Sequence, residues 1–171
     1  GSNAWHDENG EGYTLNISAT NITGENYDGV TIISPDGLTY TFGTAGKIKR
    51  IDNISNFIKV NYHDEATQDY ITSIENNSGY RYYFEYSNDY NLDGEPDSDK
   101  FALNYIYYQK KTDDNQYSTI SIDGVDVVMT YTYTLLPDGN IALSEVTYPY
   151  DSETPEVDRL TVEYLYDNGR L

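Results

Sequence analysis

The chain has 171 residues, no cysteine, and 29 acidic against 10 basic residues, which give a formal net charge of −19 at pH 7. The absence of cysteine excludes a disulfide framework, and the negative field repels phosphate backbones and anionic lipid, so nucleic acids and membrane surfaces are poor partners. No apolar run approaches the roughly 20 residues that a membrane span needs.

The first twelve residues predict no part of the fold. Gly1–Ala4 is typical of the remnant of a cleaved tag, so we expect that a native leader was removed. Trp5–Gly12 is acidic and contains two glycines, which indicates a flexible lead-in. No domain boundary is visible beyond it, so residues 13–171 are expected to form one domain.

From residue 13 onward the sequence predicts short strands separated by polar turns. Leu15 and Ile17 alternate with polar residues, and Val30–Ile33 is the next apolar run. A turn that begins at Pro35 then reverses the chain. The best candidate for a turn of helix is the segment 64–69, and no longer stretch has helical periodicity. This pattern predicts an all-β protein.

One phrase recurs along the chain: a turn residue, and then aromatic or apolar residues at every second position. Its clearest copy is 79–86, in which Gly79 precedes Tyr80, Tyr82, Phe84 and Tyr86. Other copies follow Gly37, Asn56 and Gly124, and the aromatic ends of the first three copies lie 20 to 24 residues apart. Such self-similarity predicts an antiparallel meander of repeated β-hairpins that forms an extended, curved or wrapped sheet.

Three segments carry a known pattern: Gly37–Phe42 (GLTYTF), Gly46–Ile51 (GKIKRI) and Tyr164–Leu171 (YLYDNGRL). They resemble the YD repeat of bacterial Rhs-type cell-surface and toxin-shell proteins, and the chain is also similar to secreted lipoproteins of gut Bacteroidetes that contain YD-like hairpins. The resemblance covers roughly residues 28–171. It implies an antiparallel sheet on a secreted or surface protein, with a lipid anchor at the removed N-terminus, and it implies no catalytic residue.

The long turn at 87–100 contains the most specific local pattern. Asp89, Asn91 and Asp93 alternate and precede Gly94, as in the first half of an EF-hand loop, where carboxylate and amide oxygens converge on calcium.

In that register Glu95 offers its backbone carbonyl and Asp97 takes the ninth position. The twelfth position is Lys100 instead of glutamate, so the loop is more similar to the calcium turns of extracellular repeat proteins. We predict calcium as a cofactor held by Asp89, Asn91, Asp93, Glu95 and Asp97. The alternative is a solvated acidic hairpin tip, in which Asp, Asn and Gly serve the turn alone.

Signatures of nucleophilic catalysis and of a phosphate loop are absent from the sequence. Glycoside hydrolysis needs only two carboxylates, and 29 acidic residues leave it open without selecting a pair.

Tyrosine is the unusual residue, with 20 copies. Its ring is apolar and its hydroxyl is polar, so it suits a half-wet sheet surface. Tyr83 and Tyr108 fall between the alternating sets that we expect to form the core, and they are candidate ligand-facing aromatics for sugar stacking. The alternative is that another part of the chain covers this second face.

We therefore expect a bacterial cell-surface module with a non-enzymatic structural role, or one that binds glycan or protein. A carboxylate-based glycan hydrolase and a fragment of an Rhs-type toxin-enclosing shell are the alternatives. An unpaired edge strand at either end would allow self-association.

Overall fold

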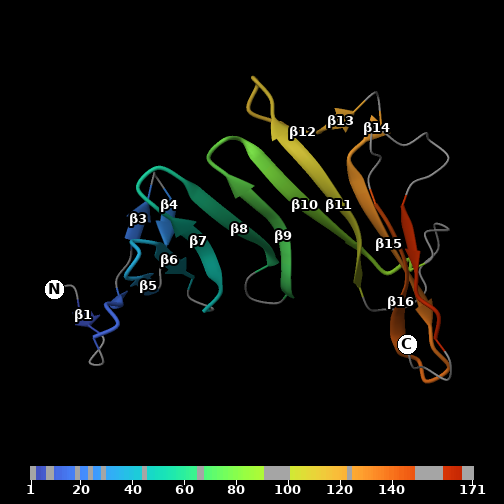
Figure 1. Ribbon diagram of the computed structural model, residues 1–171, viewed down its shortest axis with the longest axis horizontal. Helices are drawn as coiled ribbons and strands as arrows, with labels where there is room; N and C mark the ends of the chain where they lie inside the picture. The colour runs from blue at the N-terminus through green and yellow to red at the C-terminus, as the bar shows by residue number, and fades with distance from the viewer. Residues whose placement is uncertain are drawn as a thin grey trace. The chain divides into compact units, whose positions relative to one another are not determined.

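The computed structural model describes residues 3–6, 10–17, 20–22, 25–27, 30–43, 46–64, 68–90, 101–122, 125–148 and 160–166. All regular structure in these ranges is β-strand, and neighbouring strands pair in antiparallel fashion (Figure 1). The predicted all-β class is therefore confirmed. The chain divides into two compact units, unit 1 (Gly1–Gly79) and unit 2 (Tyr80–Leu171).

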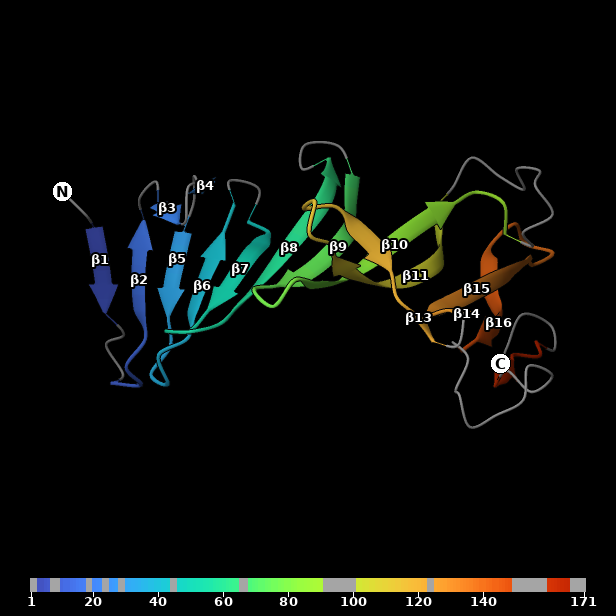
Figure 2. The same cartoon turned by 90° about the horizontal axis from the view of Figure 1, so that it is seen from above.

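Unit 1 is an antiparallel meander with the strand order β1-β2-β5-β6-β7-β8-β9, and β3 and β4 form a separate hairpin. Figure 2 shows its strands side by side in chain order. The strands are β1 (Asn3–His6), β2 (Thr14–Ile17), β3 (Thr20–Ile22), β4 (Glu25–Tyr27), β5 (Val30–Ile33), β6 (Thr39–Phe42), β7 (Ile48–Asp52), β8 (Phe57–Asp64) and β9 (Gln68–Asn76).

Two segments of unit 1 differ from what the sequence predicts. Residues 3–6, which lie in the predicted tag remnant and lead-in, form β1 and pair with β2. Of the candidate helical turn at 64–69, Asp64 lies in β8 and pairs with Gln68 of β9, and residues 65–67 lie outside the described residues. The described residues of both segments take strand structure because a neighbouring strand supplies partners for their backbone groups, which sequence periodicity does not show.

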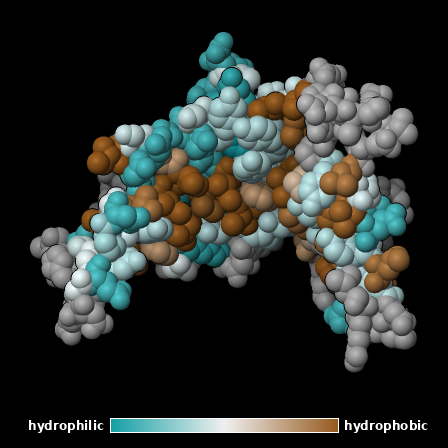
Figure 3. All heavy atoms as spheres, in the orientation of Figure 1, coloured by the Kyte–Doolittle hydropathy of each residue, from teal (hydrophilic) through white to brown (hydrophobic). Residues whose placement is uncertain are grey.

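The strand register of unit 1 separates an apolar face from a polar one. Cross-strand partners share a face, and Ile32 pairs with Tyr40, which pairs with Ile51, which pairs with Ile58. Figure 3 shows hydrophobic side chains gathered over β8 and β9. The apolar face of unit 1 consists of Leu15, Ile32, Tyr40, Ile51, Ile58, Val60 and Ile74.

A single type of turn closes several hairpins. In the turn after β15 (Val128–Leu135), the Gly139 N–H donates to Leu136 O, and the Leu136 N–H donates to Asn140 O. Gly139 has φ 78°, and Asn115 takes the same left-handed position in another turn, with φ 70°. This is a three-residue loop made of a type I turn and a left-handed residue. The glycine that recurs in the sequence therefore occupies the left-handed position of this turn.

Unit 2 is a second antiparallel meander, with the strand order β10-β11-β15-β16-β17. Strand β12 also pairs with β11, next to β15, and β13 and β14 form a small hairpin inserted between them. The strands are β10 (Tyr80–Ser87), β11 (Ala102–Lys111), β12 (Tyr117–Thr119), β13 (Ser121–Ile122), β14 (Val125–Asp126), β15 (Val128–Leu135), β16 (Ile141–Thr147) and β17 (Thr161–Glu163).

The inserted hairpin is joined to the sheet at Tyr108. The Ile120 N–H donates to Tyr108 O over 2.8 Å, and the Tyr108 N–H donates to Val127 O over 3.1 Å. The Val127 N–H closes the junction by donating to Ile120 O over 2.8 Å. The chain therefore leaves the edge of β11 after Ile120 and returns at Val127 with the backbone groups of both residues paired.

Very few side chains of the described residues are fully buried. The buried hydrophobic ones are Val60, Tyr90, Ala102 and Val146, and most other strand residues are half-buried. A sheet of this kind depends on cross-strand pairs of large side chains more than on a thick core, which agrees with the abundance of tyrosine.

Candidate binding sites

Three tyrosines on one face of β10 and β11 form a continuous aromatic surface, which we call the aromatic platform (Tyr80, Tyr82 and Tyr108). Tyr82 pairs with Tyr108 across the strands. The Tyr108 ring stacks on both of the others, with centroids 5.7 Å from Tyr80 at 16° and 5.2 Å from Tyr82 at 28°. Tyr82 is 52% exposed. The platform therefore presents aromatic rings to solvent in a fixed arrangement.

Tyr83 and Tyr108, the two aromatics that the sequence singled out together, lie on opposite faces. Tyr83 pairs with Tyr107, and their ring centroids are 6.1 Å apart. The Arg81 guanidinium lies 5.3 Å from the Tyr83 ring and 3.8 Å from the Tyr117 ring, so cations and aromatics pack together on this second face. Tyr108 thus joins the aromatic platform, and Tyr83 joins a packed cluster behind it.

Two tyrosines of these strands, Tyr107 on one face and Tyr108 on the other, have raised pKa values. Burial and a hydrogen bond with Glu85 raise the pKa of Tyr107 to about 12. Burial raises the pKa of Tyr108 above its ordinary value, and nearby Tyr82 and Tyr80 add to this. A neutral phenol can both donate and accept a hydrogen bond. Tyr108 can therefore offer the platform an apolar ring and a neutral hydroxyl that donates and accepts.

The predicted calcium loop is described only at its beginning. Asn91, Asp93, Glu95 and Asp97 lie outside the described residues. Asp89 is described, and its main chain is fixed at both ends: its N–H donates to Ser87 Oγ over 3.0 Å, and its carbonyl accepts from Asn104 Nδ2 over 3.0 Å. Within the described ranges, no three His, Cys, Asp or Glu residues gather as a metal site would require.

Unit 1 contains a pocket of about 300 Å³ beside two asparagine-rich turns, one after β7 and one after β9. We call it the turn pocket. Its apolar lining comes from Leu38, Ile51, Phe57 and Ile58. Its polar lining comes from Asp52, Asn53, Asn56, Asn76, Asn77 and Ser78. Small-molecule sites have this combination of apolar walls and a few convergent polar groups.

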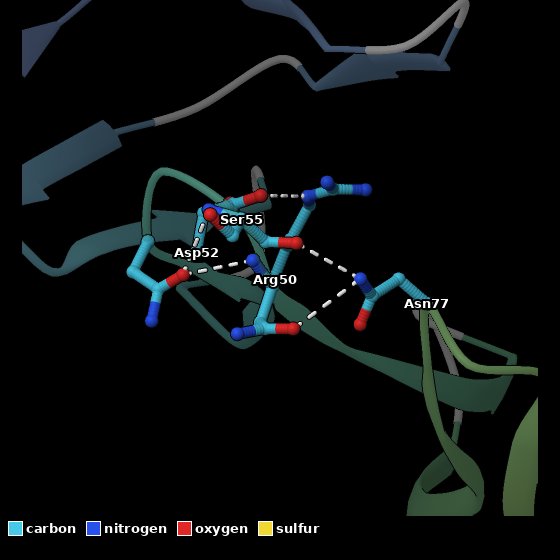
Figure 4. A network of polar contacts seen from close by, with 6 residues as sticks. Arg50, Asp52, Ser55 and Asn77 are labelled. Carbon is cyan, nitrogen blue, oxygen red and sulfur yellow. Dashed lines mark hydrogen bonds and ion pairs between the residues drawn. The ribbon is translucent and has the colours of Figure 1, made fainter.

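The two turns of the pocket are tied to each other. Asn77 Nδ2 donates to Ser55 O over 2.9 Å and approaches Asn56 Oδ1 at 3.4 Å (Figure 4). Asn53 Oδ1 accepts from the N–H groups of Ser55 and Asn56 over 3.0 and 2.8 Å, which closes the first turn on itself. The pocket lining is therefore fixed before any ligand binds.

Asp52 is the only carboxylate among the described residues that line the turn pocket. Its Oδ1 accepts from Arg50 Nε over 2.5 Å, and the Arg50 side chain is only 6% exposed. The Arg50 guanidinium also lies 3.9 Å from the centroid of the Phe57 ring. Asp52 Oδ2 is buried and has no hydrogen-bond partner in the described part of the chain. An unsatisfied buried acceptor costs roughly 1–3 kcal/mol, so this oxygen has an unused capacity to bind a donor.

Sequence reasoning missed the turn pocket. It uses Asn56 only as the residue before one copy of the repeated phrase, and it assigns no role to Asn53, Asn76 or Asn77, although asparagine is a common turn former. The available signal was their spacing along the chain. Two turns that are separated by one β-hairpin of a meander lie at the same end of the strands.

Comparison with protein-family models, with curated proteins and with solved structures gave no match to this chain. In the part of the chain that the structure describes, no helix has the length and apolarity of a membrane span.

Proposed function

We propose that this protein is a non-enzymatic, glycan-binding module of an exported bacterial cell-surface protein. The observation that carries the proposal is the aromatic platform, in which Tyr108 stacks on Tyr80 and Tyr82 and Tyr82 is half exposed. Exposed aromatic surface on a soluble protein marks interaction sites. The apolar face of a sugar ring packs on such a surface, while its hydroxyls bond with the tyrosine hydroxyls and with water.

Charge supports a neutral glycan as the ligand. With a net charge of −19, the protein repels polymers that are rich in carboxylate or sulfate. The cation nearest the platform among the cation–ring contacts of the described residues is Lys110, with Nζ 5.5 Å from the Tyr80 ring. A single lysine can donate to a sugar hydroxyl, but it does not reverse the field of the whole chain.

Two further features support a place outside the cell. The resemblance of residues 28–171 to YD repeats of surface proteins and lipoproteins favours export. The acidic loop that follows β10 is also similar to the calcium turns of extracellular repeat proteins, with Asp89, Asn91, Asp93, Glu95 and Asp97 as its proposed ligands.

The hydrolase alternative requires two carboxylates on either side of a bound sugar. The described lining of the turn pocket has one carboxylate, and it is paired with Arg50. Glu145 and Glu163 are cross-strand partners on β16 and β17, and neither of them lines the turn pocket. These contacts favour binding over hydrolysis as the proposal.

The test is a glycan array probed with the wild-type protein and two variants, each in calcium and in chelator. Tyr82→Ala removes the most exposed ring of the platform, and Tyr148→Ala removes another exposed tyrosine of unit 2 as a matched control. We expect neutral-glycan binding by the wild type and the control, and a roughly two- to tenfold weaker signal for Tyr82→Ala, since one aromatic contact contributes about 0.5–1.5 kcal/mol. Equal binding by all three proteins, or an empty array with folded protein, would contradict the proposal.

A further inference from the structure

The turn pocket of unit 1 has the composition of a site for an amphipathic ligand. Ile51 and Ile58 pair across β7 and β8 and give the pocket an apolar wall, while the amides of Asn53, Asn56 and Asn77 line its polar side. Amides both donate and accept, so they match a ligand that carries several hydroxyl groups. A ligand with one apolar face and a hydroxyl rim satisfies both kinds of lining.

Asp52 gives this pocket its strongest acceptor. The ion pair with Arg50 keeps Oδ1 occupied and fixes the side chain, while Oδ2 is buried without a hydrogen-bond partner among the described residues. Hydrogen bonds to a charged acceptor are among the stronger ones in proteins. Because Oδ2 is buried, a ligand hydroxyl reaches it only when the carboxylate turns toward the pocket, and that hydrogen bond would then satisfy an oxygen that the described chain leaves unsatisfied.

The pocket is also rigid for a site made of turns. Asn77 ties the turn after β9 to Ser55 in the turn after β7, and the Arg50 guanidinium, which is paired with Asp52, packs on the Phe57 ring. Groups that are fixed before binding lose less conformational entropy when the ligand arrives. The volume of about 300 Å³ lies at the lower end of the range for small-molecule sites, which fits one sugar ring better than an oligosaccharide.

We propose that the turn pocket binds a single neutral sugar residue, with one hydroxyl donating to Asp52 and others bonding to Asn53, Asn56 and Asn77. The choice of a sugar rests on the proposed function. The site itself is separate from the aromatic platform, which belongs to unit 2.

The experiment observes the asparagine side-chain amides of the full chain by ¹H–¹⁵N correlation NMR. The probes are the methyl glycosides of glucose, galactose, mannose and N-acetylglucosamine at millimolar concentration, with glycerol as a non-specific polyol. We expect saturable shifts of the Asn53, Asn56 and Asn77 amides with at least one glycoside, and none with glycerol. Shifts with none of the four glycosides, or equal shifts with glycerol, would overturn the proposal.

Two tryptophan variants locate the binding. Ser78→Trp places a large ring in the pocket lining, and Ile54→Trp adds the same ring at a fully exposed residue of the neighbouring turn that does not line the pocket. We expect Ser78→Trp to abolish the glycoside shifts and Ile54→Trp to retain them. If Ser78→Trp does not fold, Ile58→Trp, at an exposed position of the apolar wall, replaces it. Shifts that persist when the pocket is filled would refute the site.

The Tyr82→Ala variant separates this inference from the proposed function. If the platform proposal is wrong and the pocket proposal is right, the glycoside shifts persist in Tyr82→Ala and the wild-type array signal does not depend on Tyr82. If the platform is right and the pocket is wrong, Tyr82→Ala weakens array binding and no glycoside shifts the unit 1 amides. Both results are read from the same proteins.

Discussion

Asn104 Nδ2 donates to the main-chain carbonyl of Asp89 over 3.0 Å, and Asn104 Oδ1 accepts from the Ser87 N–H over 2.9 Å. Asn104 is completely buried. It lies where the register between β10 and β11 shifts, because Tyr86 pairs with Leu103 whereas Glu85 pairs with Tyr105. The next residue of the loop, Tyr90, is also buried, with its ring 6.1 Å from that of Tyr133. One buried amide therefore fixes the point at which the acidic loop leaves the sheet.

We predict that Asn104→Ala lowers the free energy of unfolding by about 2–3 kcal/mol, because it leaves the Ser87 N–H and the Asp89 carbonyl without this partner. Urea denaturation followed by circular dichroism measures the change. Asn140→Ala is the control, because the Asn140 amide bonds to Asp138 at an exposed turn, and we expect it to cost under about 1 kcal/mol. Equal losses in both variants would show that burial of the Asn104 amide is not what matters.

The calcium hypothesis predicts that calcium raises the Tm of the wild-type protein and that Asp93→Ala abolishes the rise. Asp93 is the third acidic or amide residue of the alternating pattern, immediately before Gly94. The matched control is Asp113→Ala, which removes an exposed acid from a different hairpin turn and should retain the full calcium effect. The same Tm shift in all three proteins would indicate non-specific screening of the net charge of −19.

Local features of the fold could be predicted from the sequence because they depend on neighbouring residues. The strand from Tyr80 and the turn at Gly139 have alternation and glycine signals that need no tertiary information. Register could not be predicted, because it depends on which residues pair across strands. The pairing of Tyr82 with Tyr108 is one such case, and it is why Tyr108 shares a face with Tyr82 and not with Tyr83.

The turn pocket shows the same limit for a site. Each of its turns, at Asn53 and at Asn77, can be predicted from neighbouring residues. The pocket exists only because the β8–β9 hairpin returns the chain to the same end of the strands. The buried ion pair of Arg50 and Asp52 has no sequence signal that distinguishes it from two solvated charges on an exposed strand.

Tyrosine ionisation predicts that the protein loses stability in alkali. The Tyr107 pKa is raised to about 12, against about 10 in the unfolded chain, because burial and Glu85 favour the neutral phenol. Stability from this group is complete below about pH 10. It is lost between about pH 10 and pH 12, where the unfolded chain ionises and the folded one does not.

Spectrophotometric titration of tyrosinate absorbance measures this prediction. We expect Tyr107→Phe to remove a transition near pH 12 and to weaken the dependence of the urea midpoint on pH above about 10. Tyr148→Phe is the control at an exposed position and should leave the transition near pH 12 in place. A wild-type titration in which all tyrosines ionise near about pH 10 would contradict the argument.

Glu145 and Glu163 lie directly opposite each other on β16 and β17, and like charges in such a pair destabilise a sheet. Glu163 is exposed, so Glu163→Lys replaces the repulsion with an attraction to Glu145 and should raise the free energy of unfolding by about 0.5–1 kcal/mol. The gain should shrink in about 1 M salt, because screening weakens interactions between exposed charges.

Asp113→Lys is the matched control, because it also replaces an exposed acid with lysine and so makes the same change in net charge, at a turn residue that is not part of this pair. It separates the specific pair from the general benefit of a positive charge on an acidic protein. If both variants gain equally at low salt, the benefit comes from net charge alone. A larger gain for Glu163→Lys, measured by urea denaturation at two salt concentrations, assigns it to the Glu145 pair.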